Sequence, residues 1–264
     1  MAGEYKLKQD MVEIGRRIYA KGYVASNDGN ISVRLSDREI LVTPTGVSKG
    51  YMSVTDMLAV DMNGNVLRGT KQATSELKMH LEVYRQRADV KAVVHAHPPV
   101  ATAFAVARKT CDKVFLPEAI LSLGMVSLAE YGTPSTDELP RSIAKYIGHS
   151  DAILPSNHGA LTVGGDLFDA YYKMETLEHF AMITMYARLL GGEKTLDCSE
   201  VASLLKIRET VFGKPPIDIK DVCGSCVKSE AGGEPGETDP TDEKTLKETI
   251  EKLVRAELEK YMKT

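Results

Sequence analysis

Segments of strand length alternate with segments of helical periodicity along residues 1–212, and this alternation restricts the fold more than any other feature. Apolar residues recur at helical spacing in 8–21, whereas 31–35 and 40–43 have the two-residue period of a strand. The same criteria predict further helices at 74–87 and 168–190 and further strands at 66–67, 92–96 and 152–154. Helices and strands that interleave in this way pack in layers, so we expect an α/β fold.

The composition changes after residue 212. Residues 213–239 are rich in glycine, proline, serine and acidic side chains, a mixture that cannot bury enough apolar surface to order itself. Residues 240–264 then regain an amphipathic pattern, with apolar residues at spacings of three and four between 243 and 262. We therefore predict a domain at 1–212, a flexible linker at 213–239 and a C-terminal amphipathic helix at 240–264.

Charge and hydropathy exclude several classes of function. The 33 basic and 37 acidic residues are well mixed and give a net charge of −4, so no basic stripe indicates a nucleic-acid partner. No apolar run approaches the roughly 20 residues that span a bilayer, and residues 1–10 lack the apolar core of a secretory signal. We expect a cytoplasmic protein with neither a nucleic-acid nor a membrane partner.

Cysteine usage is sparse. Among the four cysteines, Cys223 and Cys226 form a Cys-x-x-Cys pair, which could be half of a metal site or a redox pair. Because no second ligand pair is near in the sequence, we interpret them as reduced thiols in a loop, as is usual in a cytosolic compartment.

Histidines follow two of the predicted strands. His95 and His97 are two positions apart, so both imidazoles point to one face of a strand and can bind one cation such as zinc. His158 follows the strand at 152–154 and precedes a glycine, as a ligand on a tight turn would. Glu76 lies in the first turn of a predicted helix, where the helix dipole favours a carboxylate. Taken singly, each of these residues is also compatible with a structural or surface role.

Three turns or helix starts offer small residues and hydroxyl or amide donors of the kind that bind phosphate. The candidates for substrate binding are Asn27, Asn30, Thr45, Gly46, Thr74 and Ser75. The same residue types are good turn formers, so each segment alone is a weak indication.

These motifs occur in the order found in a known family. The matching stretches are Gly29-Asn30-Ile31-Ser32-Val33-Arg34, Thr43-Pro44-Thr45-Gly46, Ser75-Glu76 with His80 four residues on, Val93-Val94-His95-Ala96-His97 and Asn157-His158-Gly159. Jointly they resemble the class II aldolase/adducin family, most closely its L-fuculose-1-phosphate aldolase branch, over about residues 5–210. The resemblance implies a three-layer α/β/α fold with a central, largely antiparallel sheet, assembled as a homotetramer with sites between subunits.

The resemblance also implies roles within one site. It matches His95, His97 and His158 to the ligands of one Zn²⁺ per subunit, and Glu76 to the carboxylate that binds the resting metal and then acts as general base. It places the six candidate donors around the phosphate of dihydroxyacetone phosphate. The implied reaction is cleavage of a ketose 1-phosphate, such as L-fuculose 1-phosphate, to dihydroxyacetone phosphate and a small, lactaldehyde-like aldehyde.

One feature of this branch is missing. Where the branch has a tyrosine that protonates the aldehyde end, this chain has Leu116-Pro117-Glu118-Ala119-Ile120, so Glu118 or Tyr131 is the candidate proton donor. Other reactions of the family remain open: sugar-phosphate 4-epimerases, which carry aspartate where Glu76 stands, and methylthioribulose-phosphate dehydratases. A further alternative is a non-catalytic, adducin-like module, although the adducin head lacks the three histidines.

The C-terminal segment resembles a targeting sequence. An amphipathic helix after a flexible linker is similar to the encapsulation peptides that dock enzymes onto the inner face of bacterial microcompartment shells. Residues 243–262 are therefore expected to bind a shell protein and to place the enzyme inside a microcompartment. The alternative is that the helix packs on the tetramer, because an isolated helix of about 20 residues is only marginally stable.

Overall fold

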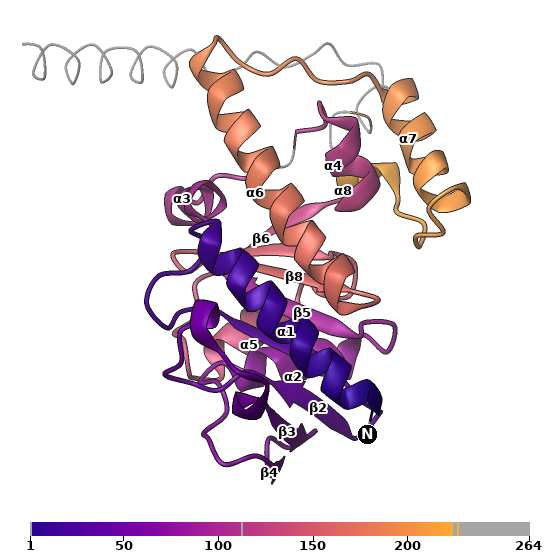
Figure 1. Cartoon of the computed structure of the whole chain (residues 1–264). Coiled ribbons are helices and arrows are strands. Elements are labelled where there is room, and N and C mark those ends of the chain that lie inside the picture. Colours follow the sequence, from indigo (N-terminus) through magenta and orange to yellow (C-terminus); the bar gives the residue numbers. More distant parts are fainter. Residues whose placement is uncertain (1, 112, 224–225, 227–264) are drawn as a thin grey trace, which may run out of the picture. The chain divides into compact units, whose positions relative to one another are not determined.

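A central eight-stranded sheet organises the part of the chain that the computed structural model describes, namely residues 2–111, 113–223 and 226. Its strands lie in the order β4-β3-β2-β1-β5-β8-β7-β6 (Figure 1). Their bounds are β1 Asn30–Arg34, β2 Glu39–Val42, β3 Leu58–Asp61, β4 Val66–Arg68, β5 Ala92–Ala96, β6 Val126–Ala129, β7 Ala152–Pro155 and β8 Ala160–Gly164. Within the described residues, β6 and β7 pair in parallel and the other neighbours pair antiparallel, which confirms the expected largely antiparallel sheet.

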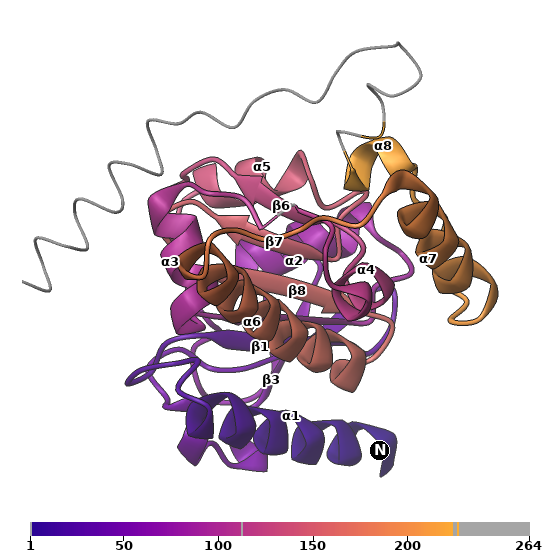
Figure 2. The same cartoon turned by 90° about the horizontal axis from the view of Figure 1, so that it is seen from above.

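Helices cover both faces of this sheet. They are α1 Ala2–Ala20, α2 Leu77–Gln86, α3 Pro99–Ala107, α4 Pro117–Ser122, α5 Glu138–Ala144, α6 Leu167–Leu189, α7 Cys198–Thr210 and α8 Ile219–Val222, with 3₁₀ turns η1 Lys49–Tyr51 and η2 Val54–Asp56. Helices α1, α3 and α6 pack on one face, and α2 and α5 pack on the other (Figure 2). The arrangement is the expected three-layer α/β/α fold.

Strand β5 lies at the centre of the sheet and belongs to two apolar cores, because successive residues of a strand point to opposite faces. Val94 is part of the core built with α1 and α6, whereas Val93 is part of the core built with α2 and α5. Both side chains are 0% exposed. The end of β5 is therefore a rigid position for side chains.

Helix α6 also fixes the chain that follows β5. Glu178 of α6 accepts hydrogen bonds from the backbone N–H groups of Val100 and Ala101, over 3.0 and 2.8 Å. These donors lie in the first turn of α3, where backbone N–H groups have no partner inside the helix. A buried glutamate thus anchors α3 directly after the predicted histidine motif.

Helix α1 begins at Ala2, earlier than the predicted start at residue 8. Its first turns are polar and therefore lack an apolar stripe, but they are supported by pairs at four-residue spacing. Lys8 Nζ lies 3.0 Å from Glu4 Oε1, and Lys6 Nζ lies 2.7 Å from Asp10 Oδ1.

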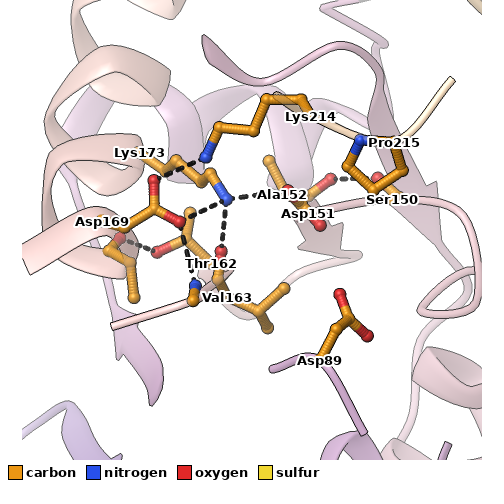
Figure 3. Close-up of polar contacts among 12 residues, drawn as sticks. Asp89, Ser150, Asp151, Ala152, Thr162, Val163, Asp169, Lys173, Lys214 and Pro215 are labelled. Atoms are coloured by element: carbon orange, nitrogen blue, oxygen red, sulfur yellow. Dashed lines mark hydrogen bonds and ion pairs between the residues drawn. The ribbon is translucent and has the colours of Figure 1, made fainter. Parts of the chain in front are cut away.

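The packed part of the chain extends beyond residue 212. Helix α8 lies in the range predicted as a linker, and the compact unit runs to Cys226. Figure 3 shows an ion pair that holds this segment on the domain: Lys214 Nζ lies 3.0 Å from Asp169 Oδ1. Asp169 is itself held by Lys173, whose Nζ lies 3.1 Å from Asp169 Oδ2 and 2.7 Å from Asp151 Oδ2. Val222 adds apolar packing, but the segment is too short to show a helical periodicity in the sequence.

The rest of the predicted linker and the predicted C-terminal helix at 240–264 lie outside the described residues, and their roles stay predictions. In the described part of the chain, no helix combines the length and the apolar content that crossing a membrane requires.

Candidate active site

Neighbouring strands bring the three candidate histidines together. His95 lies in β5, His97 follows that strand, and His158 lies in the turn between β7 and β8. Their potential ligand nitrogens all lie within 4.8 Å of one another, and His95 Nε2 is 3.2 Å from His97 Nε2. Because β8 pairs with β5, the turn that carries His158 lies directly beside the end of β5.

Glycine 159 makes this close approach possible. A Cβ atom at Gly159 would lie 2.4 Å from His97 Cδ2 and 2.7 Å from the backbone oxygen of Ala96, so any side chain would push the strands apart. Asn157, at the same turn, has a φ of 57°, in the left-handed region that asparagine tolerates better than most residues. The steric demands of the turn therefore explain the residues on both sides of His158.

Glu76 faces the histidine cluster from the start of α2. Its Oε2 lies 3.1 Å from His95 Nε2, and its Oε1 lies 2.9 Å from His158 Nε2. Asn30 Nδ2 donates a hydrogen bond to Oε2 over 2.8 Å. Glu76 is the N-cap residue of α2 rather than a member of its first turn, because the helix begins at Leu77. Its carboxylate therefore contacts two imidazoles and one amide.

A buried relay of side chains continues behind Asn30. His80 Nε2 hydrogen-bonds Asn30 Oδ1, His80 Nδ1 lies 2.6 Å from Ser32 Oγ, and Ser32 Oγ lies 2.9 Å from the Tyr84 hydroxyl. Since the NH₂ group of Asn30 donates to Glu76, its oxygen accepts from His80 Nε2–H. His80 Nδ1 then accepts from the Ser32 hydroxyl, which in turn accepts from Tyr84.

His80 and Ser32 belong to the stretches that match the family, but no role in the site was predicted for either of them or for Tyr84. The spacing of residues in β1 and in α2 nevertheless indicated that these side chains lie together. Ser32 is two positions after Asn30 on β1, and Tyr84 is four positions after His80 on α2, so each pair shares one face of its element.

Burial and mutual charge set the ionisation of the cluster. Burial raises the pKa of the Glu76 carboxyl, but the charge of His95 and the hydrogen bonds from His158 and His95 outweigh burial and hold this pKa well below its usual range. Burial lowers the pKa of His97 to about 4, and the charges of His95 and His158 add to the effect. Burial also lowers the pKa of His80 to about 3. At neutral pH the carboxylate is ionised, and His97 and His80 are neutral.

The donor set fits a divalent metal ion. His95 Nδ1 hydrogen-bonds the backbone oxygen of Ala160 over 2.9 Å, which assigns a proton to Nδ1 and directs Nε2 at the cluster. Two arrangements would give His95 Nε2 a favourable contact with the Glu76 carboxylate and the His97 ring nitrogen that face it. One is a second proton on His95, whose pKa burial lowers but the Glu76 carboxylate raises, with a net increase. The other is a cation shared by the imidazoles and the carboxylate, the donor types that zinc prefers.

A cavity of about 160 Å³ lies beside the cluster. Its lining includes five of the six predicted substrate-binding residues: Asn27, Asn30, Thr45, Thr74 and Ser75. Gly46 follows Thr45 with a φ of 71°, a conformation that glycine adopts without steric cost. The predicted phosphate donors and the histidine cluster thus meet at one cavity.

Lys49 also lines this cavity, although no sequence motif singled it out. The residue is 1% exposed, and its Nζ donates to the backbone oxygens of Asn27 over 3.1 Å and Val47 over 2.6 Å. Burial lowers the pKa of Lys49 to about 8, while the charge of Asp28 acts in the opposite sense. Lys49 therefore holds the Asn27 turn in place and puts an ammonium group beside the predicted phosphate donors.

Neither candidate proton donor lines this cavity. Glu118 is an exposed residue of α4, a helix that packs against α6 and α7. Tyr131 is 53% exposed and lines a separate depression with Arg108 and Ser156. Within one chain, the structure does not bring either residue to the histidine cluster.

Comparison with known proteins agrees with this geometry. Residues 9–185 match the family model described as Class II Aldolase and Adducin N-terminal domain. The chain belongs to the class II aldolase and adducin family. An L-fuculose phosphate aldolase of Methanococcus maripaludis is 36% identical over 174 residues, which are 66% of this chain and 93% of that protein. A 3-oxo-tetronate 4-phosphate decarboxylase of Haemophilus influenzae is 34% identical over 180 residues, which are 67% of this chain and 85% of that protein.

The fold comparison leads to the same family. A solved L-fuculose 1-phosphate aldolase superposes with a TM-score of 0.70 at 30% identity, covering 76% of this chain and 95% of that chain. The chain is an enzyme of the class II aldolase type, a carbon–carbon lyase. Metal dependence is typical of class II aldolases, and the cluster of three histidines agrees with it.

Proposed function

We propose that this class II aldolase cleaves a ketose 1-phosphate to dihydroxyacetone phosphate and a small aldehyde, with zinc as its metal. The position of Glu76 carries the proposal. Its carboxylate contacts His95, His158 and Asn30 at the wall of a cavity whose other lining residues are phosphate-type donors. A base, a metal site and a phosphate pocket are three of the parts that the reaction needs.

The proposed cofactor is one Zn²⁺ per subunit, held by His95, His97 and His158. When bound, the ion supplies Lewis-acid stabilisation of negative charge on the substrate's carbonyl oxygen. Zinc is favoured over calcium and magnesium because the ligand atoms are mainly imidazole nitrogens, whereas those two ions prefer oxygen ligands.

Glu76 is proposed as the general base. In the direction of synthesis it removes the proton from C3 of dihydroxyacetone phosphate, and in the direction of cleavage it returns that proton. The hydrogen bond from Asn30 fixes the orientation of the carboxylate. The low pKa of Glu76 keeps it ionised across the neutral range, so its proton-accepting form is always populated.

The phosphate group of the substrate is proposed to bind at the turns of the cavity. The available donors are the hydroxyl groups of Thr45, Thr74 and Ser75 and the amide of Asn27. Lys49, which is buried behind the Asn27 turn, reinforces this region with a positive charge.

A specific observation favours a second candidate reaction. The cavity contains neither Glu118 nor Tyr131, so no predicted side chain of the same chain stands ready to protonate an aldehyde oxygen. Decarboxylation of a 3-oxo acid phosphate needs no such donor, because CO₂ leaves without a proton. Loss of CO₂ from 3-oxo-tetronate 4-phosphate gives the same enediolate as the aldolase reaction, and its carbon would then take up a proton from solvent, delivered through Glu76.

One experiment separates these reactions. The purified enzyme is incubated with a panel of ketose 1-phosphates and with 3-oxo-tetronate 4-phosphate. Dihydroxyacetone phosphate, aldehyde and CO₂ are then quantified. Aldehyde in equal amount to dihydroxyacetone phosphate supports the aldolase, whereas CO₂ in that amount supports the decarboxylase. Isomerised or dehydrated sugar phosphate as the product would instead support the epimerase or dehydratase alternative.

We further propose that the enzyme is a cytoplasmic homotetramer and that residues 243–262 bind a microcompartment shell protein. Support for the tail comes from its sequence, an amphipathic pattern that follows a stretch rich in glycine, proline and acidic residues. Confinement would suit an enzyme whose product is a reactive small aldehyde. The alternative, a helix packed on the tetramer, predicts that removing it weakens the assembly.

A further inference from the structure

Three of the four cysteines meet at the end of the compact unit. Cys198 is the first residue of α7, whereas Cys223 and Cys226 follow α8. Their sulfur atoms all lie within 4.8 Å of one another. Cys223 and Cys226 are 4% and 8% exposed and Cys198 is half-buried, so water has little access to the first two thiols.

Local structure explains how the two later thiols come to face the same point. Cys223 N–H donates to the backbone oxygen of Ile219 over 2.7 Å, which closes α8. Cys226 N–H donates to the backbone oxygen of Cys223 over 3.0 Å, which holds these two cysteines close together. The third thiol, on Cys198, sits at the N-terminus of α7, where the helix dipole favours negative charge.

Two explanations of this proximity are a metal ion bound by all three cysteines and a disulfide between two of them. The structure pairs Cys198 with Cys226, and Cys223 Sγ lies 2.7 Å from Cys226 Sγ. A disulfide accounts for the proximity of two sulfur atoms, whereas one cation accounts for all three. Thiolates drawn from a Cys-x-x-Cys turn and from a distant helix are the usual ligands of a structural zinc ion.

The residues around the cysteines indicate which parts of the chain such an ion would hold together. The cysteines pack with a small apolar cluster whose main members are Val114, Ile120, Val201 and Val222. No strand contributes to this cluster in the described part of the chain. Because so little apolar area is buried there, a metal bridge between α7 and the chain after α8 would be a major stabilising contact.

We propose that Cys198, Cys223 and Cys226 bind a second divalent metal ion of the zinc type, separate from the histidine cluster. The three thiols lose their protons to solvent when the ion binds, and a water molecule takes the fourth position of the tetrahedron. The ion ties α7 to the segment that leads into the C-terminal residues. It is a structural site and takes no part in the lyase reaction.

Cobalt(II) is the probe that tests this assignment. Full-length protein is treated with a chelator under a thiol-free reductant, and Co²⁺ is added anaerobically. Wild type is expected to bind two equivalents per chain and to develop the near-ultraviolet absorption that arises from thiolate-to-cobalt charge transfer. Added Zn²⁺ is expected to abolish this band. Histidine and carboxylate ligands cannot give such a band, so the readout is specific for the cysteines.

Two variants assign the band. Cys223→Ser is expected to lose it and to keep the other equivalent of metal, whereas His95→Ala is expected to keep it. A reduced wild-type protein without the band overturns the proposal, and so does a band that persists undiminished in Cys223→Ser. If the band is absent and mass spectrometry of the alkylated, unreduced protein shows Cys198 linked to Cys226, the group is a disulfide instead.

Discussion

Asn30 donates a hydrogen bond of 2.8 Å from its side-chain amide to Oε2 of Glu76. Asn30 begins β1 and pairs in register with His95 of β5, so amide, carboxylate and imidazole meet where two strands are joined by backbone hydrogen bonds. Asn30 and Glu76 are 4% and 9% exposed. The orientation of the carboxylate is therefore set by the register of the sheet, and its role can be tested by substitution.

Glu76→Gln is expected to retain metal and to lose proton exchange at C3 of dihydroxyacetone phosphate. The amide keeps the size of the side chain but cannot accept the proton, and general base catalysis typically contributes about 10²–10⁴-fold. Exchange is followed by NMR in deuterated water. Glu82→Gln makes the same change at a surface pair on α2 and is expected to exchange at the wild-type rate. Similar exchange in both variants would remove Glu76 as the base.

His95→Ala is expected to hold one equivalent of zinc less than wild type. The substitution removes the imidazole whose Nδ1–H is held by Ala160 and whose Nε2 faces the cluster. Elemental analysis of dialysed protein measures the change. His149→Ala, at an exposed position outside the cluster, is the matched control. Equal zinc in wild type and His95→Ala would show that the histidine cluster is not the metal site.

Ser32→Ala is expected to lower kcat about tenfold, which corresponds to about 1.4 kcal/mol, with little change in KM. The substitution breaks the relay between Tyr84 and His80, so Asn30 is less firmly held against Glu76. It leaves two buried polar atoms without their partner, which typically destabilises a protein by about 1–3 kcal/mol. Urea unfolding measures the stability, and steady-state kinetics measure the rate.

The control for this substitution is Ser203→Ala, which removes an exposed hydroxyl that donates to a backbone oxygen within α7. It is expected to change neither kcat nor the free energy of unfolding appreciably. If Ser32→Ala loses stability but keeps the wild-type kcat, the relay supports the fold and does not position the base.

The free energy of unfolding is expected to fall as the pH drops from about 6.5 towards 3, in part because of His80. The unfolded chain binds a proton at His80 below about 6.5, whereas burial lowers the pKa of folded His80 to about 3. The folded state therefore binds fewer protons in this window, and the contribution reaches up to about 5 kcal/mol. Urea unfolding at several pH values should show a shallower decline in His80→Gln. A parallel decline in wild type and variant would contradict the assignment.

A chain that ends at residue 226 is expected to keep lyase activity and to be more stable than one that ends at 212. The shorter chain loses the contact of Lys214 with Asp169 and the burial of Val222, and the burial alone is worth about 2 kcal/mol. Thermal unfolding of both truncated chains checks which one is more stable, and activity assays check that the chain ending at 226 keeps lyase activity. Equal stability would mean that the segment after 212 contributes nothing to the packed unit.

The proposed docking role predicts a separate result for residues 227–264. Fused to a fluorescent protein, this segment should co-sediment with microcompartment shells. A fusion in which Leu253 and Leu258 are changed to serine should not, because the apolar stripe is then interrupted. If the unaltered fusion stays diffuse in shell-producing cells while the truncated enzyme loses its tetramer, the helix serves assembly instead.

The sequence predicted helices α1, α2 and α6 and several strands because their periodicity is clear. Helix α3 and strand β8 were not predicted. Residues of α3 are almost all apolar, and β8 is buried on both faces, so neither shows a stripe or an alternation. These elements are specified by their contacts with α6 and β5, which local patterns do not reveal.

The candidate site was predictable where its residues occur in motifs, as for His95, His97 and Glu76. The role of Lys49 could not be predicted, because its contact with the backbone of Asn27 depends on how the 3₁₀ turn η1 packs against the Asn27 turn. The contact between Cys198 and the Cys-x-x-Cys pair was missed for a similar reason. Cys198 and Cys226 are 28 residues apart, a separation at which no spacing rule applies.

The central position of β5 has a consequence for altering this enzyme. Asn30 and His95 are held by pairing of β1 with β5, and the His158 turn is held by pairing of β8 with β5. The cavity wall at Asn27, Thr45 and Ser75 instead comes from connecting segments outside the strands. Libraries that randomise the positions of Asn27 and Thr45 can therefore screen new phosphorylated substrates while the strands that hold Asn30, His95 and His158, and the segment that carries Glu76, stay unaltered.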